Sequence, residues 1–200
     1  MPAPVKLLLA SSNPGKLREY RVLAADHTVE LELLPEIDSL PAFQESAPTF
    51  AENAAGKALH YSRFVELPVL ADDSGLVVPA LGGAPGVQSA RYAGPGASYA
   101  ERVRKLLEEL REKQISDRRA RFVCVLALAE RGRMRAVFSD LVAGRLLEAP
   151  RGQQGFGYDP IFYYALLGKS FAEISREEKN LHSHRGKAFR KLLEFLEAAG

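Results

Sequence analysis

Two adjacent acids, Asp72 and Asp73, follow the apolar run at residues 69–71 and precede Ser74. The apolar run predicts a buried strand that ends directly at the two acids. Neighbouring carboxylates repel each other, and each loses hydration when it is buried. A divalent cation relieves both costs, so the pair predicts a Mg²⁺ site facing an oxygen-rich ligand. A solvated Asp-Asp-Ser-Gly turn is the alternative interpretation of these residues taken alone.

A second polar segment, SSNPGK at residues 11–16, follows a short apolar strand predicted at residues 5–10. Asn13 suits a helix N-cap and Pro14 suits the first helical position. Free N–H groups at a helix start attract anions, and Lys16 adds a positive charge within the first turn. The segment therefore predicts a phosphate site. The alternative is an ordinary strand-to-helix connection that binds no ligand. The P-loop and G-x-G-x-x-G patterns are both absent from the sequence.

The helix predicted at residues 49–64 places Asn53 and Lys57 on one face, four residues apart. Its Thr49-x-x-Glu52 spacing is typical of a capping box, which gives Glu52 a structural role. Glu45 precedes this helix in a polar loop, where a carboxylate could complete a metal site or simply be solvated.

A glycine-rich loop at residues 152–160 carries two aromatic residues, Phe156 and Tyr158, which could stack on a flat ring while polar groups read its edge. A plain turn with both rings packed inward is the alternative.

A cationic run at residues 175–186 contains Lys179, His184 and Arg185 just before the last predicted helix. These side chains supply donors suited to phosphate or to the carbonyl edge of a purine. The alternative is a solvated run of charges.

The elements that must position these segments alternate along the chain. Helical spacing of apolar residues follows Ser98-x-x-Glu101 and recurs after residue 188, and two β-rich runs at 121–130 and 134–147 flank a predicted hairpin at 131–133. Interleaved strands and helices with a hairpin predict an α/β fold in which helices flank a mixed sheet. No linker divides the chain, so residues 1–200 are expected to form a single domain.

Composition excludes several classes of protein. The 200 residues are 46% hydrophobic and 26% charged, with a net charge of +2, which gives no indication of a nucleic-acid or membrane partner. No run approaches the roughly 18 apolar residues of a membrane span, and we do not expect a signal peptide. The single Cys124 fits a reducing compartment and a core position, so the expected location is the cytoplasm.

Five segments together resemble the ITPase-like family of nucleoside triphosphate pyrophosphatases. They are SSNPGK, TFAENAAGKA, LADDSGL with GAPGVQSARYAG, GFGYDPIF, and SREEKNLHSHRG, and they run in order over residues 11–186. One departure is Glu45-Ser46-Ala47, where the family usually has Glu followed by Thr-Gly.

The resemblance implies a two-lobed α/β homodimer with a curved mixed sheet and a central cleft. It implies Mg²⁺-dependent cleavage of ITP, dITP or XTP into the nucleoside monophosphate and pyrophosphate. Asp73 would be the general base and a metal ligand, with Glu45 and Asp72 supporting the metal, and Lys16 and Lys57 would neutralise phosphate charge. Substrate contacts would come from Ser11, Ser12, Asn13, Pro14, Gly15, Lys16, Ser74, Phe156, Gly157, Tyr158, Asp159, Lys179, His184 and Arg185.

Two rival hypotheses remain at this point. A sister pyrophosphatase for pyrimidine or modified nucleotides would share the fold and the reaction, although Lys179 and the HSHRG run favour a reader of purine edges. A non-catalytic nucleotide-binding module would leave Asp72 and Asp73 unexplained, because carboxylates repel phosphate unless a metal intervenes. Metal-dependent turnover separates these hypotheses.

Overall fold

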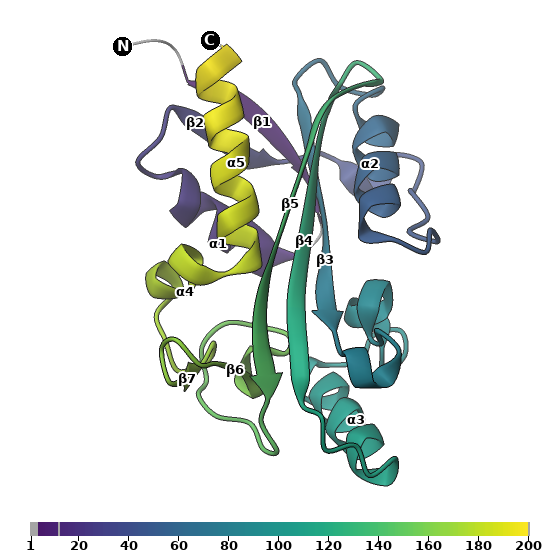
Figure 1. Ribbon diagram of the computed structural model, residues 1–200. Helices are drawn as coiled ribbons and strands as arrows, with labels where there is room; N and C mark the ends of the chain where they lie inside the picture. Colours follow the sequence, from purple (N-terminus) through teal and green to yellow (C-terminus); the bar gives the residue numbers. More distant parts are fainter. Residues whose placement is uncertain (1–3, 12, 200) are drawn as a thin grey trace. The chain divides into compact units, whose positions relative to one another are not determined.

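The computed structural model describes residues 4–11 and 13–199 (Figure 1). Helices and strands alternate, as predicted, and no helix of the described residues is long and apolar enough to cross a membrane. The elements in chain order are β1 (Val5–Ala10), α1 (Pro14–Ala24), β2 (Val29–Leu33), η1 (Ile37–Ser39), α2 (Phe50–Tyr61), β3 (Val69–Val77), η2 (Pro79–Leu81), η3 (Gly86–Arg91), α3 (Tyr99–Glu112), β4 (Arg119–Glu130), β5 (Arg133–Leu146), η4 (Asp159–Ile161), β6 (Phe162–Tyr164), β7 (Lys169–Ser170), α4 (Arg176–His182) and α5 (His184–Ala199).

Within the described residues, seven strands form one mixed sheet in the order β2-β1-β3-β4-β5-β6-β7. Strand β1 pairs in parallel with β2 and β3, whereas β6 pairs antiparallel with β5 and β7. Arg131 and Gly132 connect β4 to β5 with positive φ angles of 48° and 74°, the conformation of a two-residue type I′ turn. The hairpin and the mixed α/β sheet predicted from the sequence are confirmed.

The chain divides into two compact units. The first unit holds the described residues up to Asp73, residues 124–140, and those from His184 onward; the second holds residues 74–123 and 141–183. Strands β3, β4 and β5 contribute residues to both units, so no simple linker separates them. This explains why the sequence reads as a single domain.

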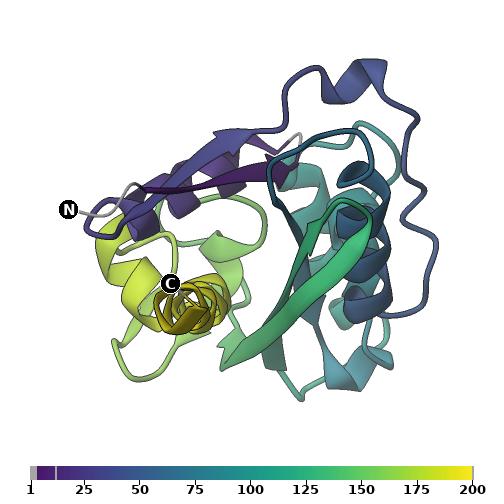
Figure 2. The same ribbon diagram turned by 90° about the horizontal axis from the view of Figure 1, so that it is seen from above.

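The first unit buries apolar side chains on both faces of its strands. Alternate residues of a strand point to opposite faces, and Leu70 packs with α1 and α5, whereas Val69 packs with α2. Figure 2 shows α5 on one side of β4 and α2 on the other. Tyr20 of α1 and Phe189 of α5 meet at a ring-centroid distance of 5.2 Å on the first of these faces.

The second unit is organised around α3. Ser98 and Glu101 form the predicted capping box at its start, and its apolar face at Val103, Leu106, Leu107 and Leu110 is buried, as the helical spacing predicts. Aromatic rings complete this core.

The structure corrects the predicted end of the central strand. β3 does not stop at the acids but continues to Val77, so Asp72 and Asp73 lie within the strand. The reason is that Ser74 and Gly75, typical turn residues, here keep an extended backbone. The structure also adds elements that the sequence did not predict: β2, β6, β7 and the short helix α4.

Gly75 is required by a close approach inside the second unit. A Cβ at this position would lie 2.3 Å from Ser89 Oγ and 2.7 Å from the Gly86 carbonyl oxygen. The same hydroxyl accepts a hydrogen bond from Leu76 N at 2.9 Å and donates one to Gly86 O at 2.6 Å. Any side chain at residue 75 must therefore displace the segment that follows η2.

We expect Gly75→Ala to lower the free energy of unfolding by about 3 kcal/mol, since a buried overlap has no room to relax. Gly82→Ala is the matched control, because a Cβ there meets nothing within 4 Å and only the φ of +64° is unfavourable, at a cost of about 1 kcal/mol. Urea unfolding measures both changes. Equal midpoints for the two variants would contradict the steric argument.

Candidate active site

The two adjacent acids of β3 lie in different surroundings because their side chains point to opposite faces of the strand. Asp72 follows Leu70 on the face covered by α1 and α5, and Asp73 follows Ala71 on the face covered by α2. Their exposed fractions are 0% and 7%, so both carboxylates are buried. The alternative interpretation, a solvated turn, is therefore excluded.

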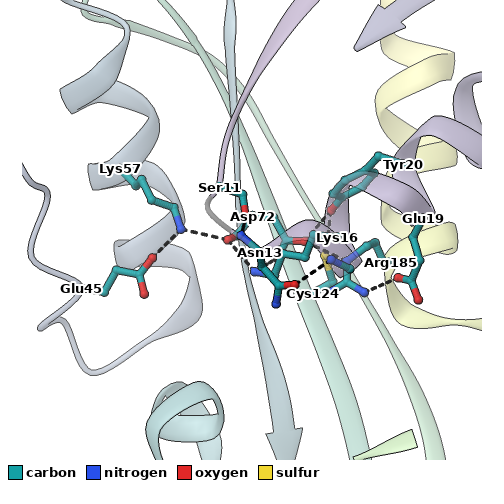
Figure 3. Close-up of polar contacts among 11 residues, drawn as sticks. Ser11, Asn13, Lys16, Glu19, Tyr20, Glu45, Lys57, Asp72, Cys124 and Arg185 are labelled. Carbon is teal, nitrogen blue, oxygen red and sulfur yellow. Dashed lines mark hydrogen bonds and ion pairs between the residues drawn. The ribbon is translucent and has the colours of Figure 1, made fainter. Parts of the chain in front are cut away.

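The Asp72 carboxylate is fully engaged by three donors (Figure 3). Lys16 Nζ donates to Oδ1 at 3.0 Å, and Tyr20 Oη and Arg185 Nε donate to Oδ2 at 2.6 and 2.9 Å. Arg185 also forms a buried ion pair with Glu19 of α1. These contacts join β3 to the first two turns of α1 and to the first turn of α5.

The charges of this network stabilise one another. Burial alone would raise the pKa of Asp72, but Lys16 and Arg185 hold it well below its usual range. Burial disfavours the charged Arg185, yet Asp72 and Glu19 keep its pKa well above the usual value. Burial, followed by the charge of Asp72, raises the pKa of the Cys124 thiol, so this cysteine is a neutral core residue, as predicted.

Two lysine ammonium groups converge beside the strand. Lys16 Nζ and Lys57 Nζ each donate to the same backbone carbonyl oxygen, that of Asp72, at 3.1 Å. Two like charges this close repel each other, and they are partly offset by the ion pairs of Lys16 with Asp72 and of Lys57 with Glu45, while α1 has no acidic residue in its first turn. An anionic ligand at the start of α1 would relieve the repulsion, which is the chemistry of a phosphate site.

The loop before α1 agrees with its prediction. Asn13 caps the helix, its Oδ1 accepting from Gly15 N at 2.9 Å, and its own N–H donates to Ser11 Oγ at 3.1 Å. Pro14 is the first helical residue. Ser12 was predicted to contact substrate and lies outside the described residues.

Asp73 carries a buried oxygen whose hydrogen-bonding capacity is unused within the described residues: its Oδ2 has no partner. Burial raises the pKa of Asp73 to about 6 despite Lys16, with Glu45 raising it further and Lys57 and a hydrogen bond with Asn53 lowering it. A buried carboxylate with a bare oxygen can accept a proton or bind a cation.

Glu45 reaches the same face and forms an ion pair with Lys57. The described residues contain no group of three or more acidic, histidine or cysteine side chains placed to hold a metal, so Glu45, Asp72 and Asp73 are not gathered into one cluster. The physical reason is that Asp72 faces away and is neutralised by cations. Glu45 and Asp73 still fit Mg²⁺, which usually binds one or two carboxylates together with waters and substrate phosphates.

The loop carrying Glu45 accommodates Ala47 at the position where the family usually has glycine. Non-glycine residues with positive φ in the described chain are Glu36, Gln114 and Arg131. Ala47 is not among them, so no left-handed backbone demands glycine there.

Other predicted site residues belong to the second unit. Lys179 Nζ donates to Asp159 Oδ2 at 2.6 Å and lies 4.8 Å from the centroid of the Phe156 ring. Phe156 is partly exposed. Tyr158 is buried, and its hydroxyl donates to the Ser89 carbonyl oxygen at 3.0 Å. For this ring, the structure agrees with the alternative interpretation of a side chain packed inward. Gly157 has a φ of +64°, and Ser74 is half-buried in β3.

His184 and Arg185 begin α5 and belong to the first unit, so they are helical rather than part of a preceding loop. Both are buried. Sequence reasoning missed the polar role of Glu19 and Tyr20. A signal existed, because they follow Lys16 at the i+3 and i+4 spacings of one helix face.

The raised pKa of Asp73 predicts that this residue destabilises the metal-free protein at neutral pH. A carboxyl titrating near 6 when folded and near 3.8 when unfolded favours the folded state only while protonated. Asp73→Asn should therefore raise stability above pH 6, by up to about 3 kcal/mol, and this gain should vanish as the pH falls from 6 to 4. Thermal unfolding in EDTA across this range measures the difference.

Mg²⁺ provides the control for this experiment. It should raise the melting temperature of the parent protein at neutral pH and leave Asp73→Asn almost unchanged, since the amide carries no charge. A constant difference between the two proteins at every pH would refute the assignment of the titration to Asp73.

Comparison with known proteins places this arrangement in a family. The model of the Ham1 family matches residues 7–195. A dITP/XTP pyrophosphatase of Geobacillus kaustophilus is 50% identical over 94% of this chain and 93% of its own. Another, from Thermus thermophilus, is 49% identical over 95% and 91%.

Solved structures agree with the sequence comparison. A HAM1 protein from Coxiella burnetii superposes with a TM-score of 0.86 at 43% identity, covering 97% of this chain and 99% of its own. A nucleoside-triphosphatase, or dITP/XTP pyrophosphatase, from Mycobacterium abscessus gives 0.70 at 40% identity, covering 96% and 99%. The resemblance inferred from the five segments is confirmed: the chain belongs to the Ham1 family.

Proposed function

We propose that this protein hydrolyses non-standard purine nucleoside triphosphates (dITP, ITP and XTP) to the nucleoside monophosphate and pyrophosphate, with Mg²⁺ as cofactor. The observation that carries the proposal is the pair of ammonium groups, Lys16 and Lys57, meeting at one carbonyl oxygen beside the bare carboxylate oxygen of Asp73. The names of the relatives support the substrate class.

The phosphate-binding groups are already in place before substrate arrives. Lys16 and Lys57 neutralise charge on the triphosphate, and the start of α1 adds the positive end of the helix dipole. Transfer at phosphorus depends mainly on positioning and on stabilising charge. Because Asp72 fixes Lys16 in the folded protein, little reorganisation is needed during the reaction.

Asp73 acts as the base. It orients a water toward the α-phosphorus and takes its proton as the new phosphorus–oxygen bond forms, while the bond from the α-phosphorus to the bridging oxygen breaks and pyrophosphate leaves. A pKa near 6 keeps the carboxylate ionised at neutral pH and basic enough to accept that proton. Glu45 and Asp73 would hold Mg²⁺, which supplies charge stabilisation and a more acidic bound water.

Recognition of the base is assigned to Phe156 and Lys179 of the second unit. His184 and Arg185, also predicted to read the base, belong to the first unit, where Asp72 and Glu19 hold the Arg185 guanidinium. Lys179 is buried and forms an ion pair with Asp159. A fixed ammonium donor suits the 6-oxo group of hypoxanthine or xanthine. Adenine presents an amino donor there and would leave a buried donor unpaired.

The proposal includes assembly as a homodimer, which rests on the family resemblance, and a cytoplasmic location, which rests on the single Cys124. The rival substrate class of pyrimidine or modified nucleotides is less well matched by a lysine donor over an aromatic ring. A non-catalytic module does not account for a buried carboxylate left with a bare oxygen.

The products of hydrolysis test the reaction. With Mg²⁺, dITP should yield dIMP and pyrophosphate in equal amounts, measured together by chromatography and a coupled pyrophosphate assay. Asp73→Asn should lower kcat by about 10²–10⁴-fold, because it removes the base and keeps the shape.

Orthophosphate and dIDP as first products would contradict cleavage at the α-phosphorus. A full panel of nucleoside triphosphates without any Mg²⁺-dependent turnover would instead favour the binding-module hypothesis.

Lys179→Met tests recognition of the base. We expect kcat/KM for dITP to fall more than that for dATP, so that selectivity shrinks about ten- to a hundredfold, the value of one charged hydrogen bond. The double variant Lys179→Met/Asp159→Asn controls for an unpaired buried Asp159 and should show the same loss of selectivity. An equal loss for both substrates would assign Lys179 to phosphate binding.

A further inference from the structure

The loop between η1 and α2 carries Glu45 and is attached to α2 on both sides of that residue. Its backbone has no sheet or helix hydrogen bonds to define it, because residues 41–46 lie outside regular secondary structure. The position of the Glu45 carboxylate therefore depends on side-chain contacts from α2.

The first attachment lies at Phe43. Its N–H donates to Tyr61 Oη at 3.3 Å, and its ring lies 5.8 Å from the His60 ring. Gly56 makes room for it, since a Cβ there would lie 2.6 Å from Phe43 Cζ.

The second attachment is Asn53, which is 1% exposed. Its Oδ1 accepts from Ala47 N at 3.0 Å, and its Nδ2 donates to Ala47 O at 3.2 Å. Asn53 also lies near enough to Asp73 for its amide to lower the pKa of that carboxyl group.

One amide therefore holds the loop of Glu45 on α2 by two hydrogen bonds and lies beside the carboxyl group of Asp73. A role in core packing alone would be met by an apolar side chain, as it is at the neighbouring buried positions Ala54 and Ala58. Glu45 itself is held by Lys57, one turn further along the same helix face.

We propose that Asn53 is a positioning residue that holds the loop of Glu45 in place, so that Glu45 can bind a divalent cation together with Asp73. This rests on the proposed function for the use of the cation, and it assigns to Asn53 no contact with substrate. Groups behind metal ligands commonly change metal affinity by about 10–100-fold when removed.

The test measures binding of Mn²⁺ alone, from the loss of the electron paramagnetic resonance signal of free Mn²⁺. Asn53→Ala should raise the apparent Kd by at least about tenfold. Ser62→Ala is the matched control: Ser62 is buried at the other end of α2, donating to Leu59 O at 3.2 Å and accepting from Gly132 N at 3.1 Å. It should bind Mn²⁺ as the parent does.

Ala47→Pro addresses the same link from the loop, without altering α2. It removes the N–H that Asn53 accepts, and it should also weaken Mn²⁺ binding, even if Asn53→Ala does not fold. If Asn53→Ala and Ala47→Pro fold and bind Mn²⁺ with a Kd within twofold of that of the parent, the proposal is overturned. An equal loss of Mn²⁺ affinity in Ser62→Ala would also overturn it.

The outcome is separable from that of the proposed function. A parent protein that hydrolyses dITP while Asn53→Ala binds Mn²⁺ normally would refute only the positioning role. A parent that binds Mn²⁺ in an Asn53-dependent manner but cleaves no nucleoside triphosphate would refute only the reaction.

Discussion

The buried carboxylate of Asp72 is the interaction on which the first unit depends. It receives hydrogen bonds from Lys16 and Tyr20 of α1 and from Arg185 of α5, while its own strand lies in the middle of the unit. Removing one member of such a buried ion network costs about 3–5 kcal/mol, because the remaining charges stay buried without compensation. Two helices far apart in the sequence are thus tied to the same residue.

This constraint also prepares the site for chemistry. Lys16 is oriented by both the side chain and the backbone carbonyl of Asp72, and Lys57 by the carbonyl and by Glu45. Donors that are fixed before the substrate binds stabilise developing charge more effectively than donors that must rearrange. In the free protein this framework of carboxylates and carbonyl groups offsets the repulsion between the two ammonium groups. In the proposed function, a bound phosphate would offset the same repulsion.

Local patterns predicted much of the fold and most of the structure of the segment that we propose to bind phosphate. The capping box of Ser98 and Glu101, the helical apolar spacing and the β4–β5 hairpin depend on neighbours in sequence, and they were predicted correctly. At α2, Thr49 caps the helix, but Glu52 accepts from its hydroxyl and not from its backbone N–H. β2 was missed because its VELEL pattern is polar on one face, and α4 because its REEK run reads as solvated charge. The partners of Asp72 could not be predicted, since Arg185 lies 113 residues away and only the tertiary fold brings it there.

The continuation of β3 through Asp72 and Asp73 has a consequence for alignment of the sheet. A slip of one residue against β1 would exchange the faces of every side chain in the strand. In one direction Asp73 would take the place of Asp72, and Ser74 would leave the other face without a carboxylate. In the opposite direction Ala71 would face the cations of α1 and α5, which would then be buried without a partner charge. The observed pairing of Ala10 with Ala71 is the register that supplies an acid to both faces at once.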